Sequence, residues 1–202
     1  MPPSAGRSGD GLHPVRTRRA RVRGAIVIAA LVVSVLATLR WVLVPYRIDG
    51  PSMSPALEDG DVVLVNRLAY FFGRPARGEV VIRRPPLECS ARQTGGAADG
   101  LKPDAVKRVA GLPGETVEIR DGALCACGVP ARLRPGLEEP RVVRKGPFGR
   151  SPVALGSDEY FLLGDASRIS SDSRRWGPAR REEIEGRVLL ILFPWERFGL
   201  VR

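Results

Sequence analysis

A Ser-Met-Ser core stands between two prolines in the stretch Gly50-Pro51-Ser52-Met53-Ser54-Pro55-Ala56-Leu57. Each proline fixes its own φ and lacks an N–H donor, which disfavours a continuous helix or a central strand. Pro55 also pushes Ser54 toward extended geometry. The sequence therefore predicts that Ser52 lies on a stiff, irregular turn leading into the apolar run 62–65.

A hydroxyl held on a rigid backbone is what a nucleophile requires, because reactivity depends on placement to within a fraction of an ångström. Ser52 is thus a candidate nucleophile. The same stretch is also typical of a plain Ser/Pro-rich connector, since such turns are common. Residues elsewhere in the chain have to decide between these two interpretations.

The chain of 202 residues is long enough for one core-forming domain with an appendage, and it shows no internal repeat. Its three cysteines are too few for a disulfide scaffold. Cys125 and Cys127 are poorly spaced for a mutual bridge, so either Cys89 pairs with one of them or all three are unpaired. No second Cys/His cluster exists to complete a four-ligand site, and we expect no metal or cofactor.

The net charge of +10 is divided between two parts of the chain. Residues 1–24 carry six arginines against one aspartate, which gives +5, and the rest is spread without a long basic block. A nucleic-acid binder more often shows a concentrated patch interleaved with aromatics, so no nucleic-acid partner is expected. Residues 1–24 lack an apolar period and are predicted to be a disordered basic tail.

An apolar segment over residues 25–45 is long enough to cross a bilayer core as a transmembrane anchor. Arg40 lies near its end, where it can reach the interface, and Trp41 and Tyr46 suit interfacial anchoring. A cleaved secretory signal is the competing interpretation, but no good small-x-small cleavage site precedes the proline-flanked stretch. The arginines before the span predict a cytoplasmic N-terminus and residues 46–202 outside.

Short alternating or β-branched runs dominate residues 46–202. Eight runs are predicted to be strands, at 46–49, 61–68, 79–83, 105–110, 115–120, 141–144, 158–163 and 187–193. Only 180–185 has helical character, and insertions are expected near 84–104 and 128–157. The predicted fold class is mainly β, a barrel-like or sandwich-like domain after one N-terminal transmembrane helix.

A general base for Ser52 would have to be a lysine or a carboxylate, because the only histidine, His13, lies in the basic tail across the membrane. Lysine is scarce, with three lysines against twenty-nine arginines. Lys107 lies in the apolar run 105–110, where period-2 alternation puts it and Arg108 on opposite faces. Burial lowers a lysine pKa into the range of a base, whereas arginine does not deprotonate. An exposed lysine on a surface strand is the alternative.

Three segments in order resemble the boxes of type I signal peptidases. They read Gly-Pro-Ser52-Met53-x-Pro-x-Leu with Gly60-Asp61, Lys107-Arg108-Val-x-Gly111-Leu112-Pro113-Gly114-Glu115, and Gly164-Asp165-x5-Ser171-Asp172-Ser173-Arg174-x-Trp176-Gly177. Their order after an N-terminal anchor makes the resemblance specific. It implies a membrane-anchored serine endopeptidase of the bacterial inner membrane, single-pass, that removes signal peptides from exported preproteins at the lipid bilayer.

The resemblance also implies roles for single residues. Ser52 would be the nucleophile, Lys107 the general base, and Ser170 the hydrogen-bonding partner that orients the lysine. The supporting residues would be Asp165, Asp172 and Arg174. The residues bordering the substrate groove would be Ile48, Met53 and Val106. Substrates would carry small residues at the first and third positions before the cut, and would bind extended along a strand edge.

This chain departs from the family pattern at two places. It has Ala166 and Ile169 where the third box often has asparagines. It also has Gly50 where many bacterial members carry a hydroxyl that helps to bind the oxyanion. Oxyanion stabilisation would then rest on the backbone N–H of Ser52 and on a backbone or water donor.

Other functions remain open at this point. A specialised pilin-type processing peptidase would use the same Ser/Lys chemistry. A membrane-tethered binding protein that kept the fold but lost catalysis is also compatible with the altered third box. A self-cleaving repressor would need a DNA-binding helical domain, which residues 1–24 cannot form.

Several large apolar residues of the outer domain are candidates for contact with lipid. They are Leu68, Tyr70, Phe71 and Phe72 after the second predicted strand, and Trp195, Phe198 and Leu200 near the C-terminus. Some of them are expected to form a patch on the membrane, close to the active site. The alternative is that they are ordinary core and loop residues.

Overall fold

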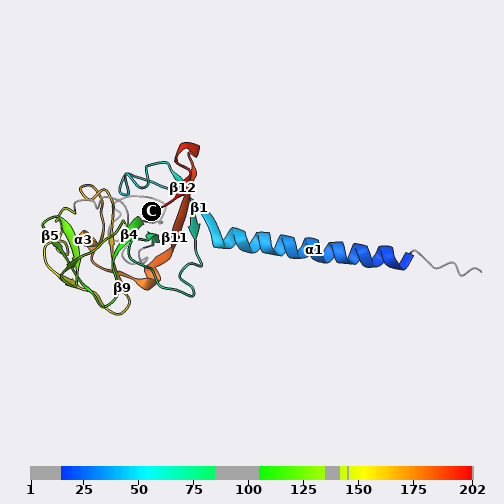
Figure 1. Ribbon diagram of the computed structural model, residues 1–202, viewed down its shortest axis with the longest axis horizontal. Helices are drawn as coiled ribbons and strands as arrows, with labels where there is room; N and C mark the ends of the chain where they lie inside the picture. Colours follow the sequence, from blue (N-terminus) through cyan, green and yellow to red (C-terminus); the bar gives the residue numbers. More distant parts are fainter. Residues whose placement is uncertain (1–14, 85–104, 135–141, 145, 202) are drawn as a thin grey trace, which may run out of the picture. The chain divides into compact units, whose positions relative to one another are not determined.

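The computed structural model describes residues 15–84, 105–134, 142–144 and 146–201. Two compact units divide the chain, Met1–Trp41 and Val42–Arg202. The described part of the first unit is helical. The second is mainly β, so the predicted fold class of a β domain after one N-terminal helix is confirmed (Figure 1).

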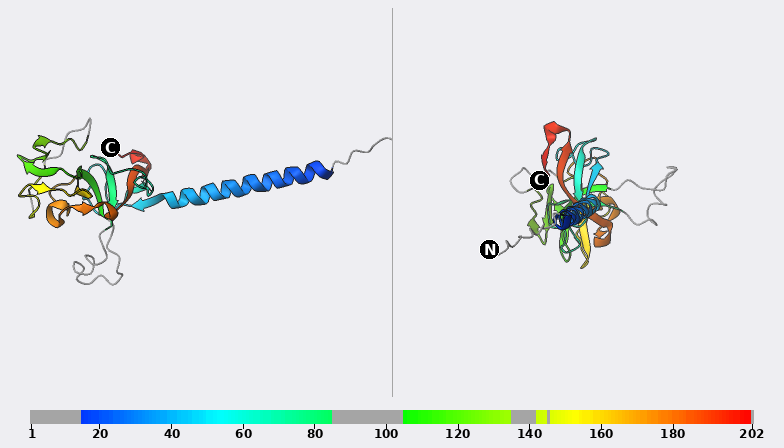
Figure 2. Two further views of the ribbon diagram at one scale, coloured as in Figure 1. Left: turned by 90° about the horizontal axis from the view of Figure 1, so that it is seen from below. Right: turned by 90° about the vertical axis from the view of Figure 1, so that its right-hand side faces the viewer.

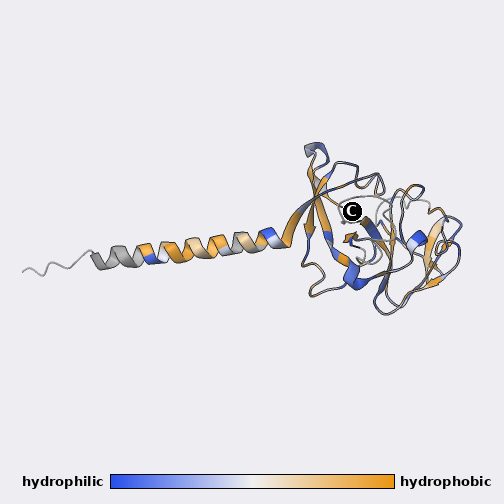
Figure 3. Ribbon diagram, turned by 180° about the vertical axis from the view of Figure 1, so that it is seen from behind, coloured by the Kyte–Doolittle hydropathy of each residue, from blue (hydrophilic) through white to orange (hydrophobic). Residues whose placement is uncertain are grey.

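Helix α1 runs from Val15 to Val42, and its part Val22–Val42 is long and apolar enough to cross a membrane. Figure 3 shows apolar residues along most of this part. The helix begins ten residues before the predicted start at 25, because residues 15–24 hold five arginines, which favour a helix. The prediction of disorder is therefore wrong for residues 15–24, while residues 1–14 lie outside the described residues.

An eight-stranded antiparallel sheet forms most of the second unit. Along the sheet the strands are β1 (Leu43–Arg47), β2 (Val62–Asn66), β11 (Ile184–Phe193), β3 (Val80–Arg83), β4 (Ala105–Gly111), β9 (Glu159–Leu163) and β10 (Ala179–Arg180), and β12 (Gly199–Leu200) also pairs with β11. Register shifts interrupt the pairing of β11 and of β4. Because such shifts bend a strand and increase its twist, the sheet curls (Figure 2).

A second, four-stranded sheet is smaller. Its order is β7 (Val129–Pro130), β6 (Ala123–Ala126), β5 (Thr116–Arg120) and β8 (Val153–Ala154). The short helical elements are α3 (Ser173–Trp176), η1 (Arg181–Glu183) and η2 (Trp195–Arg197). In β6, Cys125 is buried with a free thiol, and Cys127 is free and exposed beyond it. Cys89 lies outside the described residues, so its pairing stays open.

Seven of the eight predicted strands overlap observed ones, and the differences are local. Residues 142–144 form no strand, and 180–185 is not a helix but the end of β10, the 3-10 turn η1 and the start of β11. The expected insertion at 128–157 supplies β7 and β8 to the small sheet. These strands have two residues each, too few to show an alternating pattern.

Strand β4 lies where three apolar clusters meet. Val106 belongs to the first cluster, with Ile48, Met53, Leu57, Val63, Val65, Val80, Ile82, Val188 and Ile191. Ala110 belongs to a second cluster and Val109 to a third. Both faces of β4 are therefore covered, and all its residues after Ala105 are buried. This coverage is what encloses the polar residues of the strand.

Candidate active site

The turn that carries Ser52 is held by its own hydrogen bonds and by two apolar anchors. The Ser54 N–H donates to the Pro51 carbonyl at 3.1 Å, and the Leu57 N–H donates to the Met53 carbonyl at 3.0 Å. Met53 and Leu57 are both 0% exposed in the first cluster. The predicted stiff, irregular turn is confirmed, and its rigidity comes from insertion into the core.

Gly50 and Gly164 allow the backbone to pass close to Ser52. Gly50 has a φ of +86° and donates its N–H to Asp59 Oδ1 at 2.8 Å. A side chain at this position would be strained at this φ. A Cβ on Gly164 would overlap the Ser170 side chain and lie 2.5 Å from the Ser52 carbonyl oxygen. The segment after β9 therefore packs directly against the Ser52 turn.

Lys107 is buried beside Ser52. It is 4% exposed, and it pairs with Val81 across the β3–β4 ladder. Its Nζ lies 2.9 Å from Ser52 Oγ and donates to the Val106 carbonyl oxygen at 2.7 Å. The alternative of an exposed surface lysine is therefore wrong. The structure places a hydroxyl and an amine within proton-transfer distance.

Burial lowers the pKa of Lys107 from 10.5 to about 8. Removal of the ammonium from water is the largest cause, because low-polarity surroundings disfavour the charged form. The Asp172 and Asp165 carboxylates act in the opposite direction, and the Arg83 guanidinium adds to the lowering. The amine is thus partly deprotonated near neutral pH, as a general base has to be.

Arg108 forms a buried ion pair directly after Lys107. Its Nε and Nη2 donate to the two carboxylate oxygens of Asp165 at 2.8 and 2.7 Å, and its Nη1 donates to the Gly78 carbonyl at 2.7 Å. The sequence reasoning put Arg108 on the opposite face but missed this supporting role. An arginine inside an apolar strand was the available signal, since a buried guanidinium needs a paired carboxylate.

A second buried ion pair joins Asp172 and Arg174 at the start of α3. Arg174 Nε donates to Asp172 Oδ1 at 2.7 Å, and Asp172 Oδ2 accepts from the Gly164 N–H at 3.1 Å. Arg174 Nη1 also donates to the Val143 carbonyl and to Ser167 Oγ, at 2.8 and 2.9 Å. The pair thus ties α3 to the segment that packs on Ser52. Ser167 is a supporting residue that the sequence reasoning missed.

Ser170 is buried near Ser52, but the hydrogen bond expected from Lys107 is not formed. Within the described residues Ser170 Oγ has no hydrogen-bond partner. The Lys107 amine is instead directed to Ser52 Oγ and to the Val106 carbonyl. The expected hydrogen bond from Lys107 to Ser170 is therefore absent among the described residues, and an orienting role for Ser170 stays a prediction.

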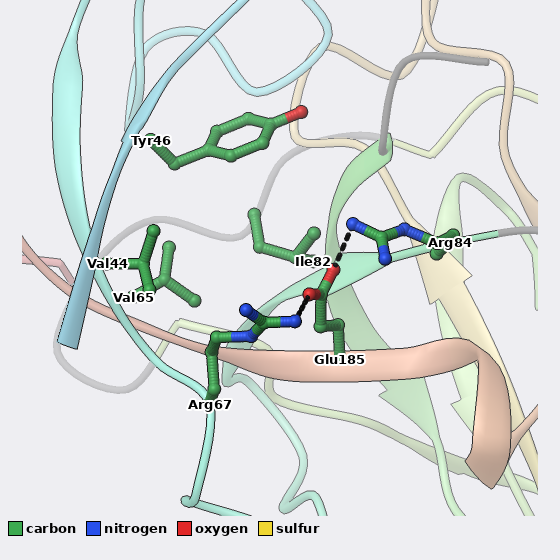
Figure 4. Close-up of a pocket in the computed structure, with 7 residues that line it drawn as sticks. All are labelled: Val44, Tyr46, Val65, Arg67, Ile82, Arg84 and Glu185. Carbon is green, nitrogen blue, oxygen red and sulfur yellow. Dashed lines mark ion pairs between the residues drawn. The ribbon is translucent and has the colours of Figure 1, made fainter. Parts of the chain in front are cut away.

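The three residues expected to border a substrate groove lie in the hydrophobic core. Ile48, Met53 and Val106 are all buried in the first cluster. A pocket of about 430 Å³ lies elsewhere over the same sheet, and Figure 4 shows its lining: Val44, Tyr46, Val65, Arg67, Ile82, Arg84 and Glu185. Glu185 bridges the Arg67 and Arg84 guanidinium groups at its rim. None of the three expected residues lines this pocket, and their contact with a substrate stays a prediction.

Backbone contacts are still made at Ala166 and Ile169, where the third box of the family often has asparagines. The Ala166 N–H donates to the Ser52 carbonyl at 3.1 Å, and the Ala166 carbonyl accepts from Ile169 and Ser170. These bonds involve main-chain atoms and so do not depend on an asparagine side chain. Ile169 is 62% exposed, so the side chain at that position points to the surface.

The site thus brings a serine hydroxyl on a core-anchored turn next to a buried lysine amine in a curled β-sheet. The family model described as signal peptidase, peptidase S26, matches residues 19–194. The chain belongs to this family, and it is a signal-peptide-cleaving serine peptidase.

Signal peptidases of other organisms are similar in sequence to most of this chain. It is 31% identical over 176 residues to a probable signal peptidase I-1 of Synechocystis sp., covering 86% of this chain and 83% of the relative. It is 32% identical over 178 residues to signal peptidase I of Leptolyngbya laminosa, covering 88% and 82%. A crystal structure of a signal peptidase I from Enterococcus faecalis overlaps 56% of this chain and 96% of its own, with a TM-score of 0.40 and 25% identity.

Replacing Lys107 by methionine should stabilise the fold below pH 8. The folded-state pKa of about 8 lies below the unfolded value of 10.5, so the unfolded state binds more protons between these values. Wild-type stability should consequently rise with pH across this window, by up to about 3 kcal/mol from Lys107. Lys107→Met should lack this rise. Urea unfolding in detergent at pH 7 and pH 10 measures it, and equal pH slopes in both proteins would contradict the buried neutral amine.

Proposed function

We propose that this peptidase cleaves signal peptides with Ser52 as nucleophile and Lys107 as general base. The observation that carries the proposal is the 2.9 Å contact between Lys107 Nζ and Ser52 Oγ in a buried setting. A histidine base is not available, since the only histidine of the chain is His13 in the N-terminal tail. The family assignment supplies the class of substrate, and this contact supplies the chemistry.

The reaction follows from the two groups. The neutral Lys107 amine takes the Ser52 hydroxyl proton as Oγ attacks the scissile carbonyl carbon. The resulting ammonium returns a proton to the leaving amine as the peptide C–N bond breaks, which leaves an acyl-enzyme ester on Ser52. Water then attacks the ester carbonyl while Lys107 accepts its proton. Lys107 returns this proton to Ser52 Oγ as the ester C–O bond breaks and the carboxyl product leaves, so the cycle ends with the lysine neutral and the serine hydroxyl restored.

The transition-state oxyanion needs donors close to Ser52 Oγ. Within the described residues the Ser52 backbone N–H makes no hydrogen bond, so it is available for this purpose. Gly50 offers no side-chain donor, and a second donor would come from a backbone group or water. Asp165, Asp172 and Arg174 support the site by holding the segment around Gly164 and Ala166 against the nucleophile turn.

The substrate is a signal peptide bound in extended form. Strand β4 pairs with β3 through Ala105–Arg108 but with β9 only from Arg108 onward. Within the described part of the chain, its first residues therefore have one unpaired edge beside Lys107. This edge supports addition of a substrate strand by backbone hydrogen bonds, with small residues at the first and third positions before the cut.

The protein is proposed to act as a single-pass protein of a bacterial inner membrane. Helix α1 supports an anchor by its length and composition. The arginines that precede the span support a cytoplasmic N-terminus and an extracytoplasmic catalytic domain. The lipid bilayer is then both the site of anchoring and the place where signal peptides are met.

Removing either member of the pair should abolish cleavage. Ser52→Ala, Lys107→Ala and their double variant should each lose at least about 10³-fold in kcat on a peptide with alanines at the first and third positions, because groups that act as one unit are non-additive. Lys107→Arg should be equally inactive, since a guanidinium stays protonated. Cleavage of this peptide by purified full-length protein in detergent measures the effect.

Two results would contradict the dyad. Substantial activity in Lys107→Arg would remove the lysine from the role of base. A wild-type protein that binds the peptide without cleaving it, while remaining folded, would favour the binding-protein alternative.

The pH dependence of kcat/KM should follow the deprotonation of Lys107. The kcat/KM value should rise with pH through an apparent pKa of about 8, because the base is active in its deprotonated form. His13→Ala serves as the control and should leave this limb unchanged. A limb near pH 6.5 that disappears in the control would assign the titration to a histidine instead.

Two exposed aromatic residues should matter only at a membrane. Phe71 and Phe72 are 73% and 91% exposed and contact each other edge to face, whereas Tyr70 of the predicted patch is buried. Phe71→Ser with Phe72→Ser should lower the cleavage rate of a vesicle-bound preprotein about tenfold or more, since each buried phenylalanine contributes about 1.5–3 kcal/mol. Cleavage of a short peptide in detergent should not change.

The control for this surface is Val129→Ser, an exposed apolar residue of the small sheet. Its rate on vesicles should equal that of the wild type. Equal rates for the double phenylalanine variant and the wild type on vesicles would remove Phe71 and Phe72 from the membrane contact.

A further inference from the structure

The C-terminal segment folds back over the sheet after β11. Residues Trp195–Arg197 form η2, and β12 then pairs antiparallel with β11, with Leu200 opposite Leu190. The Val201 N–H donates to the Leu189 carbonyl at 3.0 Å, which fixes the end of the return. This return brings η2 beside the turn that carries Ser52 (red and cyan in Figure 1), and Arg197 of η2 donates hydrogen bonds to that turn.

The Arg197 guanidinium contacts the nucleophile turn at four residues. Its Nε and Nη2 donate to the Asp61 carboxylate at 3.1–3.3 Å. Its Nη2 also donates to the Pro55 and Ala56 carbonyls, each at 3.3 Å. Its Nη1 lies 2.9 Å from Glu58 Oε1. A single side chain thus connects residues over the range 55–61, the second half of the turn.

Asp61 links these contacts to the base of the turn. Its side chain is 2% exposed, and its Oδ2 also accepts from the Glu58 N–H at 2.9 Å. Its backbone carbonyl accepts from the Ile48 N–H at 2.8 Å, at the strand-like entry to the turn. A carboxylate buried this deeply needs a cation close by, and Arg197 supplies it.

We infer that Arg197 is a positioning residue that keeps Ser52 in register with Lys107. The inference rests on the proposed function, because it gives Ser52 the role of nucleophile. The turn is anchored from the inside by Met53 and Leu57, and from the side by the Ala166 N–H on the Ser52 carbonyl. Arg197 is a further anchor, through its contacts with Pro55, Ala56 and Asp61. Without it, Pro55–Asp61 would lose four of the contacts that set the path of the backbone leading from Ser52.

A displacement of this turn would act on the rate rather than on binding. The Ser52 hydroxyl must stay within hydrogen-bond distance of Lys107, and a shift of about 1 Å at a reacting group costs up to about 10²-fold. Among the described residues, the hydrogen bonds and ion pairs of the Arg197 side chain go to Asp61, Pro55, Ala56 and Glu58. None of them goes to Ala105–Lys107 at the unpaired edge of β4, so substrate affinity should be preserved.

The experiment uses the full-length protein in detergent and a peptide with alanines at the first and third positions before the cut. The variants are Arg197→Ala, Arg197→Lys, Asp61→Asn and the double variant Arg197→Ala with Asp61→Asn. Arg120→Ala is the matched control, because Arg120 is an exposed arginine of β5 that pairs with Glu118 away from the turn. Amide hydrogen exchange is measured alongside, since the Leu57 and Gly60 amides donate hydrogen bonds inside the turn.

Arg197→Ala should lower kcat ten- to a hundredfold with KM within about twofold of the wild type. Arg197→Lys should recover part of the loss, because an ammonium neutralises Asp61 but cannot also reach both carbonyls. The double variant should be no worse than the more impaired single variant. Exchange at Leu57 and Gly60 should accelerate while the amides of β3 and β4 keep their protection, and the control should match the wild type.

Other outcomes overturn the inference. A wild-type kcat in Arg197→Ala, a loss confined to KM, or a loss of protection throughout both sheets would each remove the positioning role. If Arg197→Ala does not fold, Arg197→Lys and Asp61→Asn decide by the same split between kcat and KM. An active Ser52→Ala would count against the proposed function, whereas an inactive Ser52→Ala beside a fully active Arg197→Ala counts against Arg197 alone.

Discussion

The contact between Lys107 Nζ and Ser52 Oγ depends on the burial of the lysine amine, which costs free energy. A lysine enclosed by protein loses hydration, and its charged form becomes costly. Strand β4 accepts this cost because apolar clusters cover both of its faces. The same burial that lowers stability also lowers the pKa of the Lys107 amine to about 8. Much of the surrounding structure serves to keep these two groups together.

The buried arginines near the site differ from Lys107 in their hydrogen-bond partners and in how readily they lose a proton. Arg108 and Arg174 are as buried as Lys107, yet each is held by a carboxylate through more than one hydrogen bond. Their planar guanidinium groups stay charged and suit bidentate pairing, so they act as permanent connectors. Among the described residues, Lys107 has no carboxylate as a hydrogen-bond partner. Burial lowers the pKa of its amine, whereas a guanidinium stays protonated, so Lys107 can lose its proton where the two arginines cannot.

The turn that carries Ser52 is irregular, yet contacts with other parts of the fold hold it in place. Met53 packs in the core, the Ala166 N–H donates to the Ser52 carbonyl, and Arg197 donates to the Ala56 carbonyl. An irregular backbone of this kind can present a hydroxyl and leave its own N–H unpaired, which a strand or helix would not permit. The asparagines missing from the third box do not disturb it, because the contacts there are made by the main chain.

The sequence alone determined the fold class, the positions of most strands along the chain and the apolar helix, and it singled out Ser52 and Lys107 as candidates. These conclusions rest on local patterns, namely prolines around a serine, alternation in a strand and one lysine among arginines, and on the resemblance of three segments to the boxes of type I signal peptidases. Alternation shows which face a residue takes but not what covers that face, so the burial of Arg108 and the position of Ile48 in the core could not be read from it. The decisive contacts join residues 55, 57 and 136 positions apart, between Lys107 and Ser52, Arg108 and Asp165, and Arg197 and Asp61. Only the curling of the sheet and the return of the C-terminal segment bring such residues together, because hydrogen bonds form over about 3 Å whatever their separation along the chain.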